Sequence, residues 1–372
     1  RLATDIAFEL RESGRSKRIP NPNSPNFLDG EIVRNKDGSP VKVAGMFKDV
    51  KGVGWYIDTF KRAQISINFN NYKSSTIHDV FDAACKLADE RGIRVTGSEL
   101  VGLIPLDAII MAGKYYLQKQ GRTIGVPESD IIESAVQSLG LNDVTPFVPK
   151  EKIIEFAVGE KSGNLMSLSV DGFTNELSSN SPAPGGGSVA ALAGSLGAAL
   201  SSMVAVLTHE KKGFESQKTE MDMIGQDAQA IKDRLSFLVD EDTHAFNKVM
   251  AANRLLASND EEKTMKADAV LKANQYAIDI PFEVATLCYT IIELADVLVS
   301  KGNPNSVSDA GVAAEVALAG VRGAAMNVLI NLPGVDDDAY CGEKRNDVND
   351  LIQKAEAKHK VVFMLSRIQT SC

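Results

Sequence analysis

Residues 181–203 read SPAPGGGSVAALAGSLGAALSSM, and this stretch decides the fold of the C-terminal half of the chain. No charged residue occurs between Glu176 and Glu210, although charged residues make up 24% of the sequence. Three glycines and Ser188 precede a long run of Ala, Gly, Leu and Ser. This pattern predicts a helix that Ser188 caps and that neighbouring helices can approach closely.

The glycine turn before this helix is a candidate binding site. Glycine tolerates positive φ and lets a ligand approach the backbone, and the first N–H groups of the helix point toward the turn. The turn lacks the Lys-Ser/Thr pair of a phosphate-binding loop, and no clear strand leads into it. A flexible turn is the plain alternative. If the turn binds a ligand, the sequence indicates one other than a nucleotide phosphate.

Downstream of the turn the pattern is helical throughout. Long helices are predicted at 188–209, 216–256, 260–300, 308–332 and 346–370, after a short helix near 170–179. Pro281 is expected to start a new helix or to kink the segment that contains it. Residues 161–169 have the Gly and Ser content of a linker, so residues 170–372 should form an all-α domain.

The N-terminal part mixes strands and helices. Strands are predicted at 41–50, 54–60, 63–70 and 93–96, and helices at 2–13, 105–119 and 128–139, with one more between Thr76 and Gly92. Residues 15–41 are rich in Pro, Asn, Asp and Gly and predict a loop with a hairpin at Asp37-Gly38. The fold class is therefore an α+β domain over residues 1–160, followed by the all-α domain.

Charge and cysteine content exclude several kinds of partner. The net charge of −9 argues against a nucleic-acid-binding surface. The four cysteines lie far apart and lack the spacing of a metal site, so we expect reduced thiols, no metal and a cytoplasmic location. The chain begins at Arg1, inside an amphipathic pattern, and we interpret this start as that of a fragment or a processed product.

A membrane-spanning helix is the alternative for residues 189–208. This segment is uncharged, and its length of about 20 residues would span a bilayer. Ala, Gly and Ser dominate it, so its insertion would be marginal, and the later helices have charged faces that suit water. We expect a buried helix at the centre of a soluble domain and no membrane partner.

The loop KGNPNSVSD at 301–309 is a second candidate for ligand binding. It offers the side-chain amides of Asn303 and Asn305 and the carboxylate of Asp309. Ser308 is expected to cap the helix that follows, and a simple capping turn is the plain interpretation. As a binding loop, it would have to meet the glycine turn.

Charged residues supply two further candidates. Lys211 and Lys212 end the glycine-rich helix, where cations suit the helix dipole and would also suit ligand carboxylates. Asp240, Asp242 and His244 lie on an otherwise apolar helix. Such residues usually face solvent, but Asp242 can turn inward.

Five segments of the chain resemble the formiminotransferase-cyclodeaminase family. Four are similar to its cyclodeaminase part: residues 181–204, LVDEDTHAF at 238–246, KGNPNSVSDAGVAA at 301–314 and GAAMNVLINL at 323–332. Residues 63–108, from AQISINFNNY to GSELVGLIPLDA, resemble the C-terminal subdomain of glutamate formiminotransferase. The two matches stand in the family's order and cover nearly the whole chain.

The resemblance implies tetrahydrofolate chemistry. The family's transferase moves a formimino group from N-formiminoglutamate to tetrahydrofolate in histidine degradation. Its cyclodeaminase closes 5-formimino-tetrahydrofolate to 5,10-methenyl-tetrahydrofolate and releases ammonia, and close relatives act as methenyl-tetrahydrofolate cyclohydrolases. The family's helical domain forms dimers and rings of dimers. We therefore expect a homo-oligomer that takes a polyglutamylated folate as its substrate.

The resemblance also suggests roles for the candidate residues. Asp242 and Asp309 are expected to transfer protons or to hold the pterin, and Lys211 and Lys212 to bind the glutamate tail. The expected folate-binding groups, through backbone N–H or side-chain amide, belong to Gly185, Gly186, Gly187, Ser188, Asn303 and Asn305. In the N-terminal part, the remainder of a folate cleft is expected at Asn68, Ser98 and Glu99.

The sequence departs from the family pattern in two respects. The N-terminal transferase subdomain with its catalytic histidine is absent from this chain, and His78 is not expected to take over that role. If the chain is complete, we expect its transferase half alone to be inactive. Ser306 stands where some family members have cysteine, which excludes an essential thiol there or favours the cyclohydrolase variant. The alternative to an enzyme is a non-catalytic assembly module whose small-residue helices build an oligomer.

Overall fold

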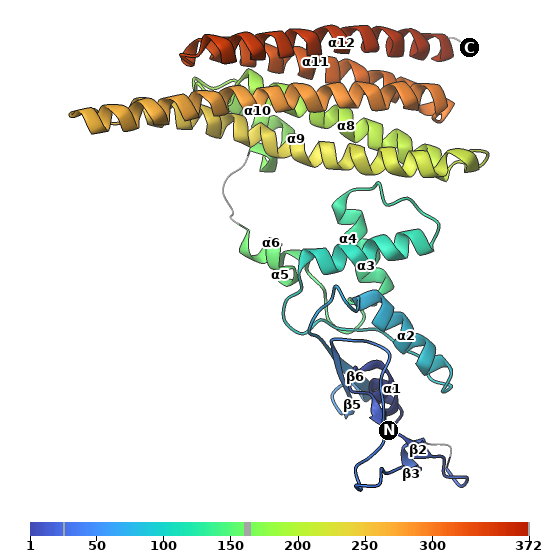
Figure 1. Cartoon of the computed structure of the whole chain (residues 1–372). Coiled ribbons are helices and arrows are strands. Elements are labelled where there is room, and N and C mark those ends of the chain that lie inside the picture. Colours follow the sequence, from blue (N-terminus) through green and yellow to red (C-terminus); the bar gives the residue numbers. More distant parts are fainter. Residues whose placement is uncertain (25–26, 160–164, 371–372) are drawn as a thin grey trace. The chain divides into compact units, whose positions relative to one another are not determined.

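The computed structural model describes residues 1–24, 27–159 and 165–370, and the chain forms two compact units (Figure 1). The first unit consists of residues 1–121 and 128–160, and the second of residues 122–127 and 161–372. The first unit combines small sheets with helices, and the second is helical apart from its turns within the described residues. The predicted fold class, α+β followed by all-α, is confirmed.

The first unit contains a β-hairpin covered by a helix. Strands β5 (Val50–Ile57) and β6 (Arg62–Phe69) pair antiparallel over their full length. Helix α1 (Leu2–Leu10) packs against this hairpin. Gly54 permits the contact, because a Cβ at this position would lie 2.3 Å from the backbone nitrogen of Thr4. The hairpin and α1 share a small core with helix α2 (Ile77–Asp89), to which Ile6, Leu10, Val50, Val80, Leu87 and Ala88 contribute.

The other strands of the first unit are short. They are β1 (Arg15–Ser16) with β4 (Lys42–Val43), and β2 (Arg18–Ile19) with β3 (Glu31–Ile32), which follows the 3-10 helix η1 (Phe27–Asp29). The predicted hairpin is confirmed, since the Asn35 N–H donates to the Ser39 carbonyl at 2.8 Å and Gly38 has a φ of +83°. The predicted strand at 41–50 is wrong except for β4 and the first residue of β5.

Helices complete the first unit. They are α2 (Ile77–Asp89), α3 (Leu106–Lys119), α4 (Glu128–Ser138), α5 (Pro149–Lys152) and α6 (Ile154–Val158). Thr76 caps α2, because its hydroxyl accepts the Asp79 N–H. The predicted strand at 93–96 is wrong: the Ile93 N–H donates to the Ala88 carbonyl and so closes the end of α2 instead of joining a sheet.

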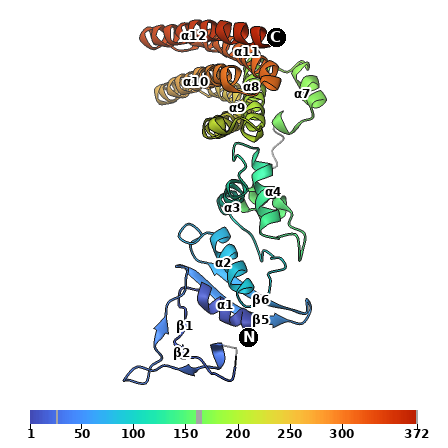
Figure 2. The same cartoon turned by 90° about the vertical axis from the view of Figure 1, so that its right-hand side faces the viewer.

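The second unit is a bundle of long helices with short helices between them (Figure 2). Its elements are η2 (Leu165–Ser167), α7 (Val170–Leu177), α8 (Gly186–Glu210), η3 (Glu215–Gln217), α9 (Lys218–Asn253), α10 (Asp260–Lys301), η4 (Pro304–Ser306), α11 (Val307–Asn331), η5 (Leu332–Gly334) and α12 (Asp338–Thr370). The five predicted long helices are confirmed. Pro281 lies inside α10, so of the two alternatives predicted for this position, a new helix or a kink, the new helix is wrong.

Small residues let α8, α10 and α11 meet closely, as the sequence predicted. A Cβ on Gly194 of α8 would lie 2.5 Å from the sulfur of Cys288, and a Cβ on Gly320 of α11 would lie 2.6 Å from the same atom. Cys288, on α10, is fully buried. Its thiol therefore occupies a notch that exists because two neighbouring helices carry glycine.

Residues 122–127 pack against the bundle within the second unit. The Asp222 carboxylate on α9 accepts hydrogen bonds from the Thr123 hydroxyl and from the Ile124 N–H, the latter at 2.9 Å. The backbones of Gly125 and Gly225 touch, since a Cβ on Gly125 would lie 2.6 Å from the Gly225 Cα. This short segment is thus held by α9 through one carboxylate and a pair of glycines.

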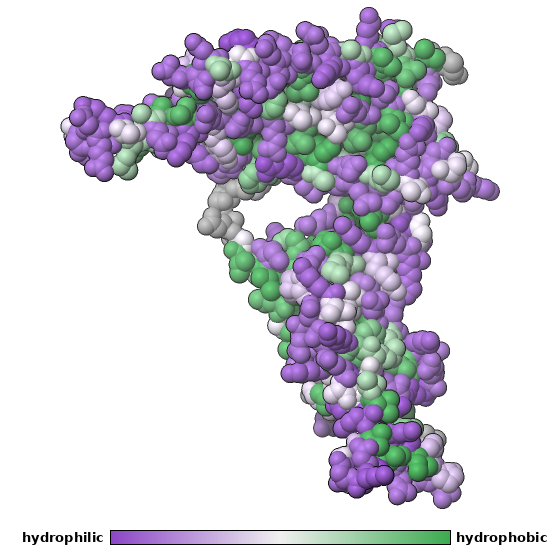
Figure 3. Space-filling model, in the orientation of Figure 1, coloured by the Kyte–Doolittle hydropathy of each residue, from purple (hydrophilic) through white to green (hydrophobic). Residues whose placement is uncertain are grey.

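Among the described residues, two segments are long and apolar enough to cross a membrane, namely α8 and the run Pro304–Gly334. In the most apolar window of each, 56% and 50% of the residues are buried inside the structure. The buried half of α8 matches the expectation of a central helix. The other half leaves apolar side chains exposed, and Figure 3 shows apolar patches among the polar surface of the helical unit.

Candidate functional site

The glycine turn places the N-terminus of α8 against a carboxylate of α9. Helix α8 begins at Gly186 with Gly185 as its N-cap residue, and none of Gly185, Gly186 and Gly187 has a positive φ. Glycine is needed at 187 for space instead, because a Cβ there would lie 2.0 Å from Oδ1 of Asp242. The expected conformational role of the glycines is therefore wrong, and close approach is the reason for Gly187.

Ser188 lies in the first turn of α8 and is not its cap. Its hydroxyl is fully buried, at 2.9 Å from the Val239 carbonyl and 3.2 Å from Oδ2 of Asp242. The single hydroxyl proton can be donated to either oxygen. Ser188 therefore ties the start of α8 to the turn of α9 that carries Asp242, and the predicted capping role is wrong.

Asp242 is a half-buried carboxyl whose pKa is shifted by its surroundings. Burial raises the pKa of its carboxyl above the usual value for aspartate, and hydrogen bonds from the side chain and backbone of Ser188 only partly offset this. The backbone N–H groups of Gly186 and Gly187 lie in the first turn of α8, where a helix leaves its donors without intrahelical acceptors. The turn therefore combines N–H groups that have no intrahelical acceptor with a carboxyl whose pKa is raised.

Asn327 on α11 belongs to the same end of α8, and sequence reasoning missed it. A Cβ on Gly186 would lie 3.5 Å from Nδ2 and 4.0 Å from Oδ1 of Asn327. The signal was present in the sequence, since Gly320, Gly323 and Asn327 follow helical spacing within and just before the segment GAAMNVLINL.

A second polar group lies at the C-terminal end of α8. The Lys211 ammonium donates to Oδ1 of Asn303, and the Asn303 N–H donates to the Thr208 hydroxyl at 2.9 Å. The Asn305 N–H also donates to Oδ1 of Asn303, at 3.0 Å. Asn303 thus caps η4, and α11 begins at Val307, so the predicted capping by Ser308 is wrong.

The two polar groups lie at opposite ends of one helix. Helix α8 has 25 residues, and at about 1.5 Å per residue its ends are roughly 36 Å apart. Asp309 lies in the first turn of α11, at the same end as Asn303, and Lys212 is exposed beside Lys211. Within one chain, the expectation that the 301–309 loop meets the glycine turn is therefore wrong.

The predicted residues of the first unit differ in the contacts they make. Asn68 is exposed on β6 opposite Lys51 of β5. Glu99 accepts a hydrogen bond from Nε2 of Gln64, also on β6, at 3.2 Å. The Ser98 hydroxyl donates to the Leu139 carbonyl at 2.5 Å, so it anchors its turn to the end of α4. Asn68 and Glu99 thus lie along β6, and Ser98 has a structural contact.

His78 has a packing role within the first unit. Its ring stacks on Tyr115 with centroids 4.3 Å apart, and its Nδ1 is buried without a hydrogen-bond partner. Burial lowers the pKa of His78, so the neutral ring is favoured. Among the residues that the structure describes, no group of three or more His, Cys, Asp or Glu side chains is placed to hold a metal ion.

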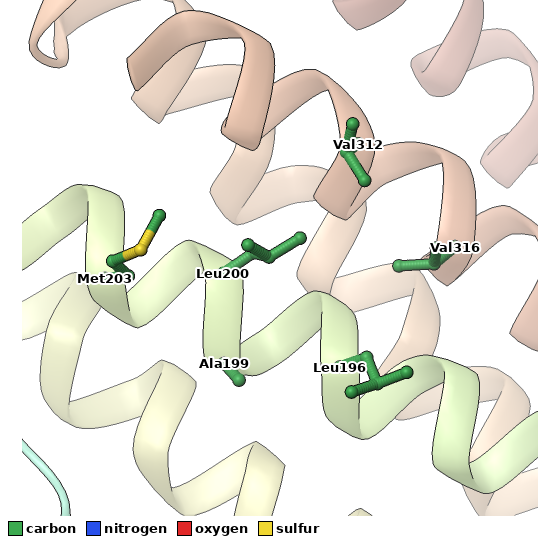
Figure 4. Close-up of a pocket in the computed structure, with 6 residues that line it drawn as sticks. All are labelled: Leu196, Ala199, Leu200, Met203, Val312 and Val316. Carbon is green, nitrogen blue, oxygen red and sulfur yellow. The ribbon is translucent and has the colours of Figure 1, made fainter. Parts of the chain in front are cut away.

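A shallow apolar pocket lies between the two ends of α8 (Figure 4). Its lining residues are Leu196, Ala199, Leu200 and Met203 of α8 and Val312 and Val316 of α11. All six side chains are apolar, and Leu196 is 55% exposed. The side chains that line the pocket therefore offer hydrophobic contacts and include no acid, base or nucleophile.

Comparisons with known proteins match both parts of the chain. Residues 1–159 match the family model described as "Formiminotransferase domain", and residues 169–350 match that described as "Formiminotransferase-cyclodeaminase". Formimidoyltransferase-cyclodeaminase of Sus scrofa is 34% identical over 366 residues, which are 98% of this chain and 63% of that protein. The chain thus spans less than two thirds of the length of this relative.

Two further proteins are similar to about half of the chain. Methenyltetrahydrofolate cyclohydrolase of Methylorubrum extorquens is 36% identical over 194 residues, which cover 52% of this chain and 93% of that protein. The crystal structure of formiminotetrahydrofolate cyclodeaminase from Thermotoga maritima has 28% sequence identity and a TM-score of 0.49, and the match covers 54% of this chain and 96% of that one.

Proposed function

The chain belongs to the formiminotransferase-cyclodeaminase family, and from this premise we propose that its helical unit converts 5-formimino-tetrahydrofolate to 5,10-methenyl-tetrahydrofolate and ammonia. The observation that carries the proposal is the close approach of Gly187 to the half-buried carboxyl of Asp242, beside N–H groups at the start of α8 that have no intrahelical acceptor. The reaction closes a ring and expels an amine, and both steps need proton transfer.

The proposed reaction assigns two proton transfers to Asp242. A bond forms between the 10-nitrogen and the formimino carbon, and the bond from this carbon to the departing nitrogen breaks. The proton of the 10-nitrogen and one further proton end on the departing nitrogen, which leaves as ammonia. A carboxyl whose pKa is raised by burial supplies a proton more readily near neutral pH than an exposed aspartic acid does. The N–H groups of Gly186 and Gly187 hold an electron-rich edge of the folate.

A spectroscopic assay tests this function. Purified protein is mixed with 5-formimino-tetrahydrofolate, and the absorbance of methenyl-tetrahydrofolate is followed together with ammonia release. Catalysed formation of both products is expected. Absence of both from folded protein contradicts an enzyme and supports the non-catalytic assembly module.

Hydrolysis of 5,10-methenyl-tetrahydrofolate is the second candidate activity. It is favoured by the similarity to the cyclohydrolase of Methylorubrum extorquens, because the match covers 93% of that protein. Water then takes the place of the amine, and the same carboxyl transfers the protons. Decay of methenyl-tetrahydrofolate absorbance, without added ammonia, measures this activity in the same cuvette. The ratio of the two rates assigns the main reaction.

The glutamate tail of the folate is proposed to bind at the other end of α8, through Lys211 and Lys212. Because that end lies roughly 36 Å from Asp242 along the helix, we propose that one site combines the two ends from two copies of the chain. Exposed apolar residues support a dimer through this face, namely Val189, Leu196, Met203 and Leu207 of α8 and Val312, Met326 and Ile330 of α11. An antiparallel pair of α8 helices would bring Lys211 of one copy to Asp242 of the other.

Mixing two inactive variants tests the shared site. Asp242→Asn and Lys211→Ala proteins are unfolded together, refolded and assayed at substrate concentrations below KM. If the site is shared, about a quarter of the wild-type activity returns, because half of the dimers are mixed and each has one intact site. If both residues act within one chain, the mixture stays inactive. Leu196→Asp should yield monomers in sedimentation, as a check on the interface.

The cellular setting is also a proposal. We place the protein in the cytoplasm and in histidine degradation. The three described cysteines, Cys85, Cys288 and Cys341, are free thiols, which suits a reducing compartment. Fractionation of cells that produce the tagged full-length protein tests the location.

A further inference from the structure

One face of α11 follows α8 toward its N-terminal end. Gly320, Gly323 and Asn327 share this face, because they lie three and four residues apart. A Cβ on Gly320 would lie 3.1 Å from the Ala190 carbonyl oxygen, and a Cβ on Gly323 would lie 3.2 Å from the Ala190 Cβ. Asn327 comes one turn later and reaches Gly186. The face thus ends with a polar side chain beside the glycine turn.

The two polar atoms of the Asn327 amide differ in their hydrogen bonds. Its Nδ2 donates to the Gly323 carbonyl at 2.8 Å, one turn back in the same helix. No described residue donates a hydrogen bond to its Oδ1. The hydrogen bond of Nδ2 fixes the orientation of the amide plane. The side-chain carbonyl oxygen of this half-buried residue is therefore held in one direction as an acceptor.

The polar groups at the turn complement one another. Gly186 and Gly187 offer N–H donors, Asp242 offers a carboxyl that can gain or lose a proton, and Oδ1 of Asn327 can only accept. A heteroaromatic ring or an amidine with a lone pair beside an N–H group matches such a set of donors and acceptors. We propose that Oδ1 of Asn327 accepts a hydrogen bond from an N–H group of the bound folate and so helps to orient it; this inference rests on the proposed cyclodeaminase function.

A purely structural role is the competing explanation, since asparagine inside a helix often bonds to its own backbone. Asn331 supplies the matched control, because it lies one turn further along α11 and its Nδ2 donates to the Ala277 carbonyl of α10 at 2.7 Å. Both residues have an amide that is bonded to a backbone carbonyl, but Asn327 lies beside the glycine turn, where a Cβ on Gly186 would be 3.5 Å from its Nδ2.

The test compares Asn327→Leu, Asn327→Asp and Asn331→Leu in steady-state kinetics with 5-formimino-tetrahydrofolate. Loss of one uncharged hydrogen bond should raise KM about five- to tenfold in Asn327→Leu, with kcat within about twofold. Asn327→Asp keeps an acceptor in place, so its KM should rise less. Asn331→Leu should leave KM unchanged, and thermal unfolding of each variant reports any loss of stability separately.

Three outcomes decide the inference. An unchanged KM in Asn327→Leu overturns it, and so does an equal rise in KM for Asn331→Leu. A lower kcat at constant KM also overturns the binding role. If the wild-type protein does not turn over the substrate while remaining folded, the proposed function itself fails, and this result is separate from any effect of Asn327.

Discussion

The two ends of helix α8 both carry polar side chains, but they differ in how these side chains are held. At the N-terminal end, the Asp242 carboxyl accepts a hydrogen bond from the Ser188 hydroxyl. The N–H groups of Gly186 and Gly187 lack intrahelical acceptors. At the C-terminal end, Oδ1 of Asn303 already accepts from both Lys211 and Asn305.

This difference suggests different roles for the two ends of α8. Groups that are already bonded to one another hold a fold, whereas a buried carboxyl with few partners has a shifted pKa and can exchange protons with a ligand. We therefore propose that proton transfer takes place at the N-terminal end of α8. The C-terminal end builds the turn into α11 and offers the remaining protons of the Lys211 ammonium to an anionic tail.

Loss of the carboxyl should have the largest effect. Asp242→Asn keeps the shape of the side chain but removes its acid–base function, so kcat should fall about 100-fold or more. Asp240→Asn is the matched control, because the Asp240 carboxylate accepts the Leu165 N–H at 2.6 Å and points to a different partner. Equal losses in the two variants would contradict the assignment of Asp242.

The glycine contact should show the next largest effect. In Gly187→Ala the added methyl would lie 2.0 Å from Oδ1 of Asp242, so the carboxyl or the helix must move. We expect a kcat loss of about tenfold or more and a destabilisation of about 1–3 kcal/mol. Gly186→Ala places its methyl at an ordinary 3.5 Å from Asn327 and should have a smaller effect on kcat. A reversed order in kinetics and chemical denaturation would refute this role of Gly187.

Substitutions at the C-terminal end of α8 should mainly change the stability of the fold. Asn303 is 9% exposed and its side chain accepts two hydrogen bonds, so Asn303→Ala should lower the free energy of unfolding. The expected loss is about 1–3 kcal/mol. Asn305 is exposed, and Asn305→Ala should change stability by less than about 0.5 kcal/mol. Urea denaturation measures both, and similar values would show that Asn303 does not hold the turn.

The smallest effect should be a pH dependence of stability. Because burial raises the pKa of Asp242 in the folded state, the folded protein binds more protons than the unfolded chain does between the two pKa values. The wild-type protein should therefore lose stability relative to Asp242→Asn as the pH rises from the usual aspartate pKa through the raised one. Melting temperatures of both proteins between about pH 4 and pH 7 measure this difference. A constant difference across the range would show that the carboxyl is not destabilised by burial.

Much of the fold followed from the sequence by itself. Helical spacing located the five long helices, and the excess of Ala, Gly and Ser in α8 and α11 indicated their close packing. These features are local, because a helix period and the size of a side chain depend on neighbours in the chain. The short strands were harder, since residues 93–96 have the composition of a strand but form none, and the Ile93 N–H donates to the end of α2.

The tertiary structure decided which polar residues meet. The sequence places Asp240, Glu241 and Asp242 side by side, but successive residues of a helix point about 100° apart. Asp240 therefore holds the Leu165 N–H, Glu241 accepts from the Tyr276 hydroxyl of α10, and Asp242 faces Gly187 of α8. The direction of α11 decided the position of the 301–309 loop. Helix α11 runs antiparallel to α8, so this loop lies at the opposite end of α8 from the glycine turn, where the Asn303 N–H donates to the Thr208 hydroxyl.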